Sequence, residues 1–366
     1  MRNVLRSIHF LILFLSIISV SVSCYAAPPA GRNTTINATV DKASPTDTYI
    51  WKDESGGNGE YPLPYARNTW VCLSSTDSTN GKCPTEPKAE NSGNITGTTD
   101  IVLLFVEKRT GAAARLTVKA SRMVGGYGPY HIEAAAVGAS ASYTALATFY
   151  IPKSEIAKFP TGGMWHAKLN MALTEWEPRQ KLADWVAYIN LNVTDNNNVQ
   201  IYFPEFSSAA PRIDLNLRPL PGSGGNQSQM TGLANIDMCL YDGFDSYSSS
   251  FTVKFTDQPK GSAPRDNDDF SLYHDTGDTS AESGRIDYQV AMHLPDGSTL
   301  TVDRGKDNVI PDISSAPVRP VLLPGIPEPV TCVPVPLTLS TKPIQISSKQ
   351  AGHYTGHLIV DFTPQL

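Results

Sequence analysis

The sequence predicts an all-β protein built from two sandwich domains in tandem, and three observations support this prediction. Only 17% of the 366 residues are charged, and 27 Gly and 28 Pro interrupt the chain often. Segments in which apolar and polar residues alternate recur along the whole chain, as half-buried strands require. No apolar pattern with the helical period exceeds two turns, although residues 154–158 could form one turn. Many short strands with frequent turn signals are typical of a sandwich.

The expected strands fall into two groups, and a chain of this length suggests two domains. In the first group we expect strands at residues 101–106, 116–120, 143–151, 165–173, 185–193 and 199–203. In the second group we expect them at residues 213–217, 236–241, 251–255, 286–294, 335–339 and 358–362. The segment 206–211 between the groups is small, uncharged and ends in proline. We therefore predict a first domain at 27–207, a linker at 208–211 and a second domain at 212–366.

Residues 1–26 are predicted to be a secretory signal peptide. Arg2 and Arg6 make the start basic, residues 10–20 are almost entirely apolar, and small residues follow up to a cleavage site after Ala26. The apolar run is short for a membrane span. The alternative is a lipoprotein anchored at Cys24, although Ser21 stands where such sites usually carry leucine.

Cleavage leaves four cysteines, which is an even number in an oxidising export route. They are Cys72, Cys83, Cys239 and Cys332. Three pairings are open, and the simplest joins Cys72 to Cys83 and Cys239 to Cys332, one disulfide in each half. A zinc site would need Cys-x-x-Cys or mixed Cys/His spacing, and neither occurs in the sequence.

The sequence contains no motif of an enzyme, so we predict no catalytic residue, no cofactor and no metal. A Gly-x-Ser-x-Gly elbow, an HExxH helix and a P-loop are all missing from it. A pair of glycosidase carboxylates stays open, because such pairs need not be close in sequence. The formal net charge of −6 argues against nucleic acid as a partner.

Two groups of residues have a metal-binding interpretation with a simpler alternative. His353 and His357 are four residues apart, but they lie beside glycines and an expected strand, where two exposed strand-edge histidines explain them. Asp266, Asp268 and Asp269 could offer oxygen ligands to calcium. The glycine and glutamate of an EF-hand are missing there, so a solvated acidic loop is the alternative.

Several strings are similar to one protein family. They are CLSS at 72–75, GKCP at 81–84, GGMW at 162–165, RIDLNLRP at 212–219, DMCLYDG at 237–243 and AGHYTGHLIVDFTP at 351–364. Together they resemble the minor tip adhesins of the alternate chaperone–usher (class 5) fimbriae. This family includes the tip adhesin of colonization factor antigen I fimbriae and the minor subunit of cable pili. The similarity weakens at 107–142 and 256–330, and a further cysteine pair typical of the first domain is missing.

The resemblance implies an immunoglobulin-like adhesin domain followed by a pilin domain that lacks its last strand. A donor strand from the major pilin would complete the second domain, after a periplasmic chaperone and an outer-membrane usher have handled the subunit. The sequence agrees, because the chain ends just after the strand 358–362. Leu358, Val360 and Phe362 share one face of that strand and need cover. The alternative is a closed sandwich whose last strand comes from elsewhere in the chain.

The resemblance also implies a receptor site, in which basic residues at the far end of the adhesin domain bind acidic or sialylated host glycans. Arg67 matches a functional arginine of the family. The family's second basic site is an arginine pair, for which Arg179 and Lys181 are the nearest substitutes. A guanidinium suits a carboxylate because it offers paired donors. For all three residues the alternative is a local surface ion pair.

Neighbouring residues could support or weaken this site. Glu175 and Glu177 would repel an anion. Trp176 could stack on a sugar ring, or fold onto its own domain.

These observations predict a secreted fimbrial tip adhesin on the bacterial surface, which binds a host glycoconjugate and initiates fibre assembly. One alternative is an assembly-initiating minor pilin with little receptor binding. The other is a secreted carbohydrate-active enzyme.

Overall fold

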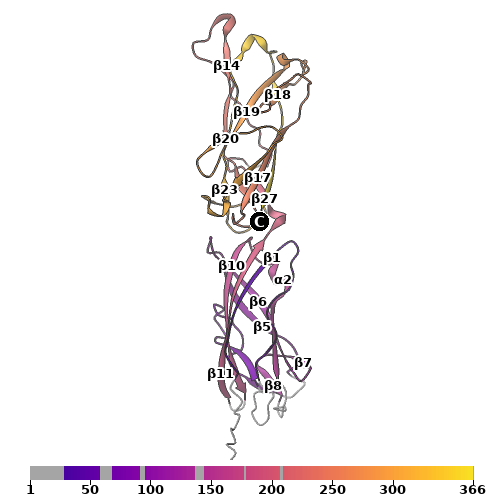
Figure 1. The fold of residues 1–366 in the computed structure, drawn as a ribbon, viewed down its shortest axis with the longest axis vertical. Coiled ribbons are helices and arrows are strands. Elements are labelled where there is room, and N and C mark those ends of the chain that lie inside the picture. The colour runs from indigo at the N-terminus through magenta and orange to yellow at the C-terminus, as the bar shows by residue number, and fades with distance from the viewer. Residues whose placement is uncertain are drawn as a thin grey trace, which may run out of the picture.

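The computed structural model describes residues 29–57, 68–90, 95–136, 144–176, 179–206 and 209–365. The chain is almost entirely β-structure and forms two domains that lie end to end (Figure 1). The described part contains one α-helix, the single turn α2 at Lys153–Ile156, close to the turn expected at 154–158. The predicted all-β fold with two sandwich domains is therefore confirmed. Within the described residues, no helix has the length and apolar character needed to cross a membrane.

The first domain contains strands β1 to β11. Their bounds are β1 Arg32–Asp41, β2 Thr48–Ser55, β3 Asn68–Cys72, β4 Lys88–Glu90, β5 Thr99–Glu107, β6 Ala113–Val124, β7 Tyr127–Tyr130, β8 Ala134–Ala136, β9 Ala145–Ile151, β10 Gly163–Trp176 and β11 Arg179–Thr194. The main sheet has the order β1-β11-β10-β5-β6-β9-β2. The N-terminal strand β1 runs parallel to β11 over ten residues. The strand β1 is therefore part of the main sheet of the first domain.

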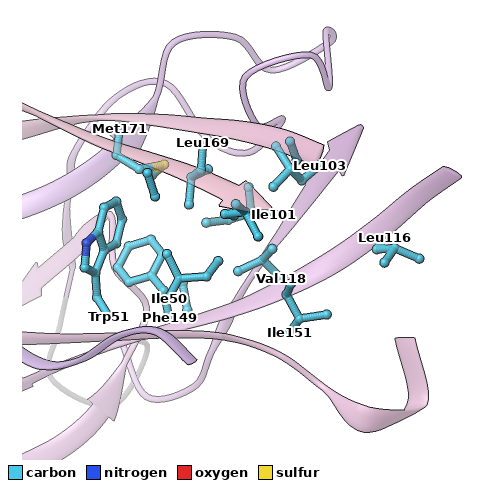
Figure 2. Packing of buried hydrophobic residues seen from close by; sticks show 14 of the residues in the cluster. Ile50, Trp51, Ile101, Leu103, Leu116, Val118, Phe149, Ile151, Leu169 and Met171 are labelled. Atoms are coloured by element: carbon cyan, nitrogen blue, oxygen red, sulfur yellow. The ribbon is translucent and has the colours of Figure 1, made fainter. Parts of the chain in front are cut away.

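The core of the first domain follows from the alternation in its strands. Side chains from β2, β5, β6, β9 and β10 point toward a common interior, as Figure 2 shows. Trp185 is fully buried and packs edge-to-face against Trp51 and Trp70, with ring centroids 5.1 Å apart in both pairs. Buried aromatic rings in this geometry stabilise a core by more than their area alone.

The second domain contains β12 to β27. Their bounds are β12 Gln200–Tyr202, β13 Arg218–Pro219, β14 Gln229–Thr231, β15 Leu233–Ile236, β16 Cys239–Tyr241, β17 Ser250–Asp257, β18 Phe270–His274, β19 Arg285–His293, β20 Thr299–Thr301, β21 Asp307–Pro311, β22 Arg319–Val321, β23 Val330–Pro334, β24 Leu337–Ser340, β25 Ile344–Gln345, β26 Tyr354–Thr355 and β27 Leu358–Gln365. A longer sheet has the order β15-β24-β19-β18-β26, and a smaller one has the order β21-β17-β27. Their inner faces share one hydrophobic core.

The single strand expected at 236–241 is wrong, because residues 237 and 238 separate β15 from β16, which lie in different sheets. The strand expected at 213–217 is also wrong. Residues 213–217 form no strand, although Ile213 and Leu215 turn toward the core as the alternation predicted. Asn216 has a left-handed backbone with φ 47°, which an extended strand does not allow. The burial pattern was therefore right, and the backbone conformation was not.

The junction between the domains was predicted at 208–211, and Ser207 and Ser208 lie outside the described residues. Upstream of them, β12 pairs with β16 of the second domain. Ile201 and Phe203 pack against the second core. Residues 200–203 are thus attached to the second domain.

Each domain contains one disulfide. Cys72 at the end of β3 is bonded to Cys83, and Cys239 in β16 is bonded to Cys332 in β23. The sequence separations are 11 and 93 residues. In the chain-entropy model such loops stabilise by roughly 3 and 5 kcal/mol.

Arg109 joins the two domains. Its guanidinium donates to the carbonyl oxygens of Asp245, Ser246 and Ser314 at 2.9, 2.9 and 2.8 Å. It also lies 4.2 Å from the ring centroid of Tyr247, within cation–π range. These contacts tie the loop after β5 to two loops of the second domain.

The backbones of the two domains also meet directly. The Asp195 N–H donates to the Gly243 carbonyl at 2.8 Å. A Cβ atom on Gly162 would lie 2.0 Å from the same oxygen, and one on Gly243 would lie 2.4 Å from the Asp195 carbonyl. Only glycine allows so close an approach at these two positions.

Candidate receptor surface and open strand edge

The first candidate site lies at the end of the first domain that faces away from the second domain. Strands β7 and β8 and the start of β11 lie at this end (Figure 1). β11 begins with Arg179, whose register partner Trp176 ends β10. The structure therefore places Arg179 and Lys181 at the far end of the first domain.

Arg179 borders a shallow hollow in this surface. The hollow is lined by Ser75, Pro84, Thr85, Glu86, Pro87, Lys88 and Arg179. The Arg179 guanidinium lies 3.1 Å from the Glu86 carboxylate, and their side chains are 63% and 75% exposed. An ion pair this exposed contributes at most about 1 kcal/mol. A ligand carboxylate can therefore replace Glu86 as the partner of Arg179 at little cost.

Lys181 has a similar local partner. Its ammonium lies 2.7 Å from the Asp184 carboxylate, and both side chains are about half exposed. Local ion pairs were the alternative for Arg179 and Lys181, and both residues make one. Arg67 and Glu177 lie outside the described residues, and so does the Trp176 side chain. Glu175 is buried, so it is not part of the exposed surface on which its repulsion of an anion was expected.

Two features of this end were missed by the sequence analysis. Lys88 adds a second cation to the lining of the hollow. Tyr127 on β7 is 69% exposed, the largest exposed fraction among the exposed large apolar residues described. The sequence does contain a signal for the exposure of Tyr127, because the glycines and the proline at 125–129 around it are typical of a tight turn.

The second candidate site is the edge of β27. This strand pairs with β17 along its whole length, from Leu358 opposite Asp257 to Gln365 opposite Ser250. No described residue pairs with the other side of β27. Strands with such an edge are templates for pairing with another chain.

The inner face of β27 is incompletely covered. Leu358, Val360 and Phe362 are half-buried and alternate with exposed residues. In the neighbouring strand β17, the inward residues Phe251, Val253 and Phe255 are all fully buried. The Phe362 ring reaches Phe251 at 4.9 Å between centroids. The contrast arises because β17 has a strand on each side and β27 has one only.

The outer face of the same sheet is polar. Lys254 on β17 lies between Asp307 on β21 and Asp361 on β27 in the strand register. Its ammonium lies 2.8 Å from the Asp307 carboxylate. The hydrogen bond to Asp307 raises the pKa of Lys254, and the charges of Asp307 and Asp361 add to this effect.

The structure describes both groups of residues that have a metal-binding interpretation. The ligand atoms of Asp266, Asp268 and Asp269 lie within 4.8 Å of one another. The Lys342 ammonium forms ion pairs with two of them, at 3.1 Å from Asp266 and 3.3 Å from Asp269. His353 and His357 are both exposed near the start of β27, as the alternative interpretation described them.

The fold and the two sites define a class of protein. It has an exposed, charged surface at the far end of one domain and, in a second sandwich, a sheet edge that no described residue pairs with. Two family models match the sequence, and both describe the CFA/I fimbrial protein CfaE: its first domain matches residues 22–196, and its second domain matches residues 199–366. The chain therefore belongs to the CfaE family of CFA/I fimbrial proteins, and the resemblance seen in the sequence is confirmed.

Individual relatives match this chain over most of the length of both proteins. The CFA/I fimbrial protein CfaE of Escherichia coli is 31% identical over 327 residues, which cover 84% of this chain and 82% of that protein. The crystal structure of CfaE, the adhesive subunit of the CFA/I fimbria of enterotoxigenic E. coli, matches with a TM-score of 0.74 at 27% identity. That match covers 92% of this chain and 94% of the other. A structure of a chaperone–tip adhesin complex of CFA/I fimbriae biogenesis matches with a TM-score of 0.68 at 26% identity, covering 93% and 98%.

Proposed function

We propose that this protein is a fimbrial tip adhesin, which binds a host glycoconjugate through its first domain and initiates fibre assembly through its second. This proposal rests on one observation: β27 has an edge that no described residue pairs with, and the apolar side chains on its inner face are only half-buried. The first domain uses the N-terminal strand β1 for its own sheet. In this proposal the subunit accepts a strand through its second domain, while β1 stays in the sheet of the first domain, and the subunit stands at the tip of the fibre.

The location of the two sites fits this role. The C-terminal end of β27 lies beside the first domain, whereas the Leu358 end lies deeper in the second domain (Figure 1). The next subunit has to approach from the side away from the first domain. A strand that reaches from there along β27 toward the junction has its N-terminus near Gln365 and runs antiparallel to β27.

The partners in this proposal follow from export and assembly. A signal peptide at 1–26 takes the chain to the periplasm. A periplasmic chaperone protects the edge of β27 there, as supported by the similarity to a chaperone–tip adhesin complex. An outer-membrane usher then presents the subunit to the major pilin, and the finished protein lies at the fimbrial tip on the cell surface.

The receptor site in this proposal is the far end of the first domain, with Arg67, Arg179 and Lys181 binding a carboxylate-bearing glycan. The exposed ion pairs of Arg179 and Lys181 are weak enough to be exchanged for a ligand. The relatives are described as fimbrial and adhesive proteins, so we propose binding without catalysis.

A glycan array with the mature protein, purified with its chaperone, tests the receptor site. We expect binding to sialylated or otherwise acidic glycans that falls at least about tenfold in Arg67→Ala and in Arg179→Ala, since a charge-assisted hydrogen bond contributes about 1.5–3 kcal/mol. Arg115→Ala is the matched control, because Arg115 is an exposed arginine of β6 away from this end. Fibre initiation without any glycan binding would favour the minor pilin instead.

A further inference from the structure

Three strands of the second domain place a row of charges on the outer face of the sheet beside the open edge. The row is Asp307 on β21, Lys254 on β17 and Asp361 on β27, each directly opposite the next in the antiparallel register. The signs alternate across the sheet. Directly opposed residues of opposite charge attract across antiparallel strands, and like charges destabilise the pair.

Of its two acidic neighbours, Asp307 and Asp361, Lys254 forms an ion pair with Asp307 only. Its ammonium forms an ion pair with Asp307 at 2.8 Å. Among the described residues, Asp361 has no ion-pair partner within 4.0 Å, and it is exposed. The rows on either side are uncharged, with Thr252 opposite Thr363 and Thr256 opposite Ile359. Asp361 is therefore a single charge at the end of an alternating row, at the edge where the next strand adds.

We propose that the pilin segment that completes this sheet carries a lysine or arginine directly opposite Asp361, and that Asp361 selects for this residue. The inference rests on the proposed function, because it takes the occupant to be a pilin N-terminal segment antiparallel to β27. In that geometry the residue opposite Asp361 points to the same outer face. The residues opposite Val360 and Phe362 point inward and are apolar.

The rest of the outer face supplies no competing cation among the described residues. A shallow hollow over it is lined by Thr252, Lys254, Asp307, Asp361, Thr363 and Gln365. Lys254 is the one cation in this lining. A basic side chain from the added strand would extend the row to Asp307, Lys254, Asp361 and cation, so that each carboxylate has its own partner. An acidic side chain there would meet Asp361 without compensation.

The test fixes the register of the added strand by covalent attachment. An Asn-Gly turn and a short strand are added after Leu366 of the full chain, because the added strand runs antiparallel and two-residue turns of this kind join antiparallel strands. The sixth residue of the added strand is then opposite Asp361, and it is Lys, Thr or Glu in three otherwise identical proteins. Valine occupies the positions opposite Leu358, Val360 and Phe362. The readout is the urea unfolding of the second domain.

We expect the Lys protein to have a folding equilibrium constant about two- to fivefold larger than the Thr protein, and the Glu protein a smaller one, from the usual strength of cross-strand pairs. Asp361→Asn should abolish the differences, and about 1 M NaCl should reduce them. Asp303→Asn is the matched control, since it removes the same charge from an aspartate already paired with Lys306. The differences should persist in this variant.

Two results would overturn the inference in distinguishable ways. If all three added strands stabilise the second domain equally, strand acceptance stands and the selection by Asp361 is wrong. If none of them stabilises the domain relative to the unextended chain, the proposed function itself fails, and the inference fails with it.

Discussion

Asp245 is a titratable residue inside the second domain, next to the contact that its backbone carbonyl makes with Arg109. It is fully buried, and one carboxylate oxygen accepts the Thr331 N–H at 2.8 Å. Its other oxygen has no hydrogen-bond partner among the described residues. Burial, together with the nearby charges of Glu107 and Asp242, raises the pKa of Asp245 to about 7. The carboxylate form is thus disfavoured in the folded chain.

This pKa predicts how stability changes with pH. A carboxyl group with a folded pKa above its unfolded value stabilises the fold at low pH, and the effect is lost as pH rises from the unfolded pKa through the folded one. We expect the thermal stability of the second domain to fall between about pH 4 and pH 7. Asp245→Asn should flatten this fall and raise stability at neutral pH. Identical pH profiles for the two proteins, measured by thermal unfolding, would contradict this assignment.

Some individual residues were predictable from sequence and others were not. Cysteine parity led to the two disulfides that the structure contains. Arg109 was not predicted, because its role depends on carbonyl groups more than 130 residues away along the chain. Its loop is held by Glu107, a buried carboxylate that accepts the Arg109 and Thr110 N–H groups. A lone acidic residue at the end of an expected strand gives no signal of this kind.

At the scale of elements, β27 differs from its neighbour β17 in how its inner face is covered. Val360 is half-buried, although its register partner Phe255 is fully buried. Alternation in the sequence predicted this strand and its inward face correctly. The same alternation at 213–217 predicted a strand that does not form, because hydrophobic pattern reports which side chains face a core and does not report strand pairing.

The inner face of β27 leads to a prediction about assembly. Val360→Asp places a charge on the apolar face that the added strand must cover, and burying an unpaired carboxylate costs several kcal/mol. We expect cells that express this variant to show few or no fibres in electron micrographs. Thr363→Asp puts the same charge on the opposite, polar face of the same strand, so its fibre number should fall by a few fold at most. Normal fibres in Val360→Asp would exclude this face as the donor-strand site.

At the scale of the whole molecule, the two proposed sites lie in different domains that are joined by a specific contact. The receptor surface lies at the far end of the first domain, and β27 belongs to the second (Figure 1). Arg109 and the close approach of Gly162 to Gly243 hold the domains together. In the proposed fibre, this arrangement would keep the proposed receptor surface pointing away from the next subunit.

The junction predicts a change in shape when Arg109 is removed. Arg109→Ala eliminates three hydrogen bonds to carbonyl groups and a contact with the Tyr247 ring, and we expect the junction to lose about 2–4 kcal/mol. Small-angle X-ray scattering should then report a wider range of interdomain orientations. Lys108→Ala is the control, because Lys108 is an exposed neighbour on the same loop. Scattering curves that are identical for the wild type and Arg109→Ala would show that other contacts fix the orientation.

We propose that the second domain is completed by a β-strand from another chain along β27. Hydrogen exchange of the β27 amides, measured on the mature protein before and after a pilin N-terminal peptide is added, tests this most directly. Without the peptide, we expect fast exchange of the β27 amides that point away from β17, because the amides that point toward β17 are already hydrogen-bonded. With the peptide, we expect strong protection of these outward amides, while β17 stays protected throughout. Outward amides in β27 that are already as protected as those in β17, and that do not respond to the peptide, would contradict the proposal.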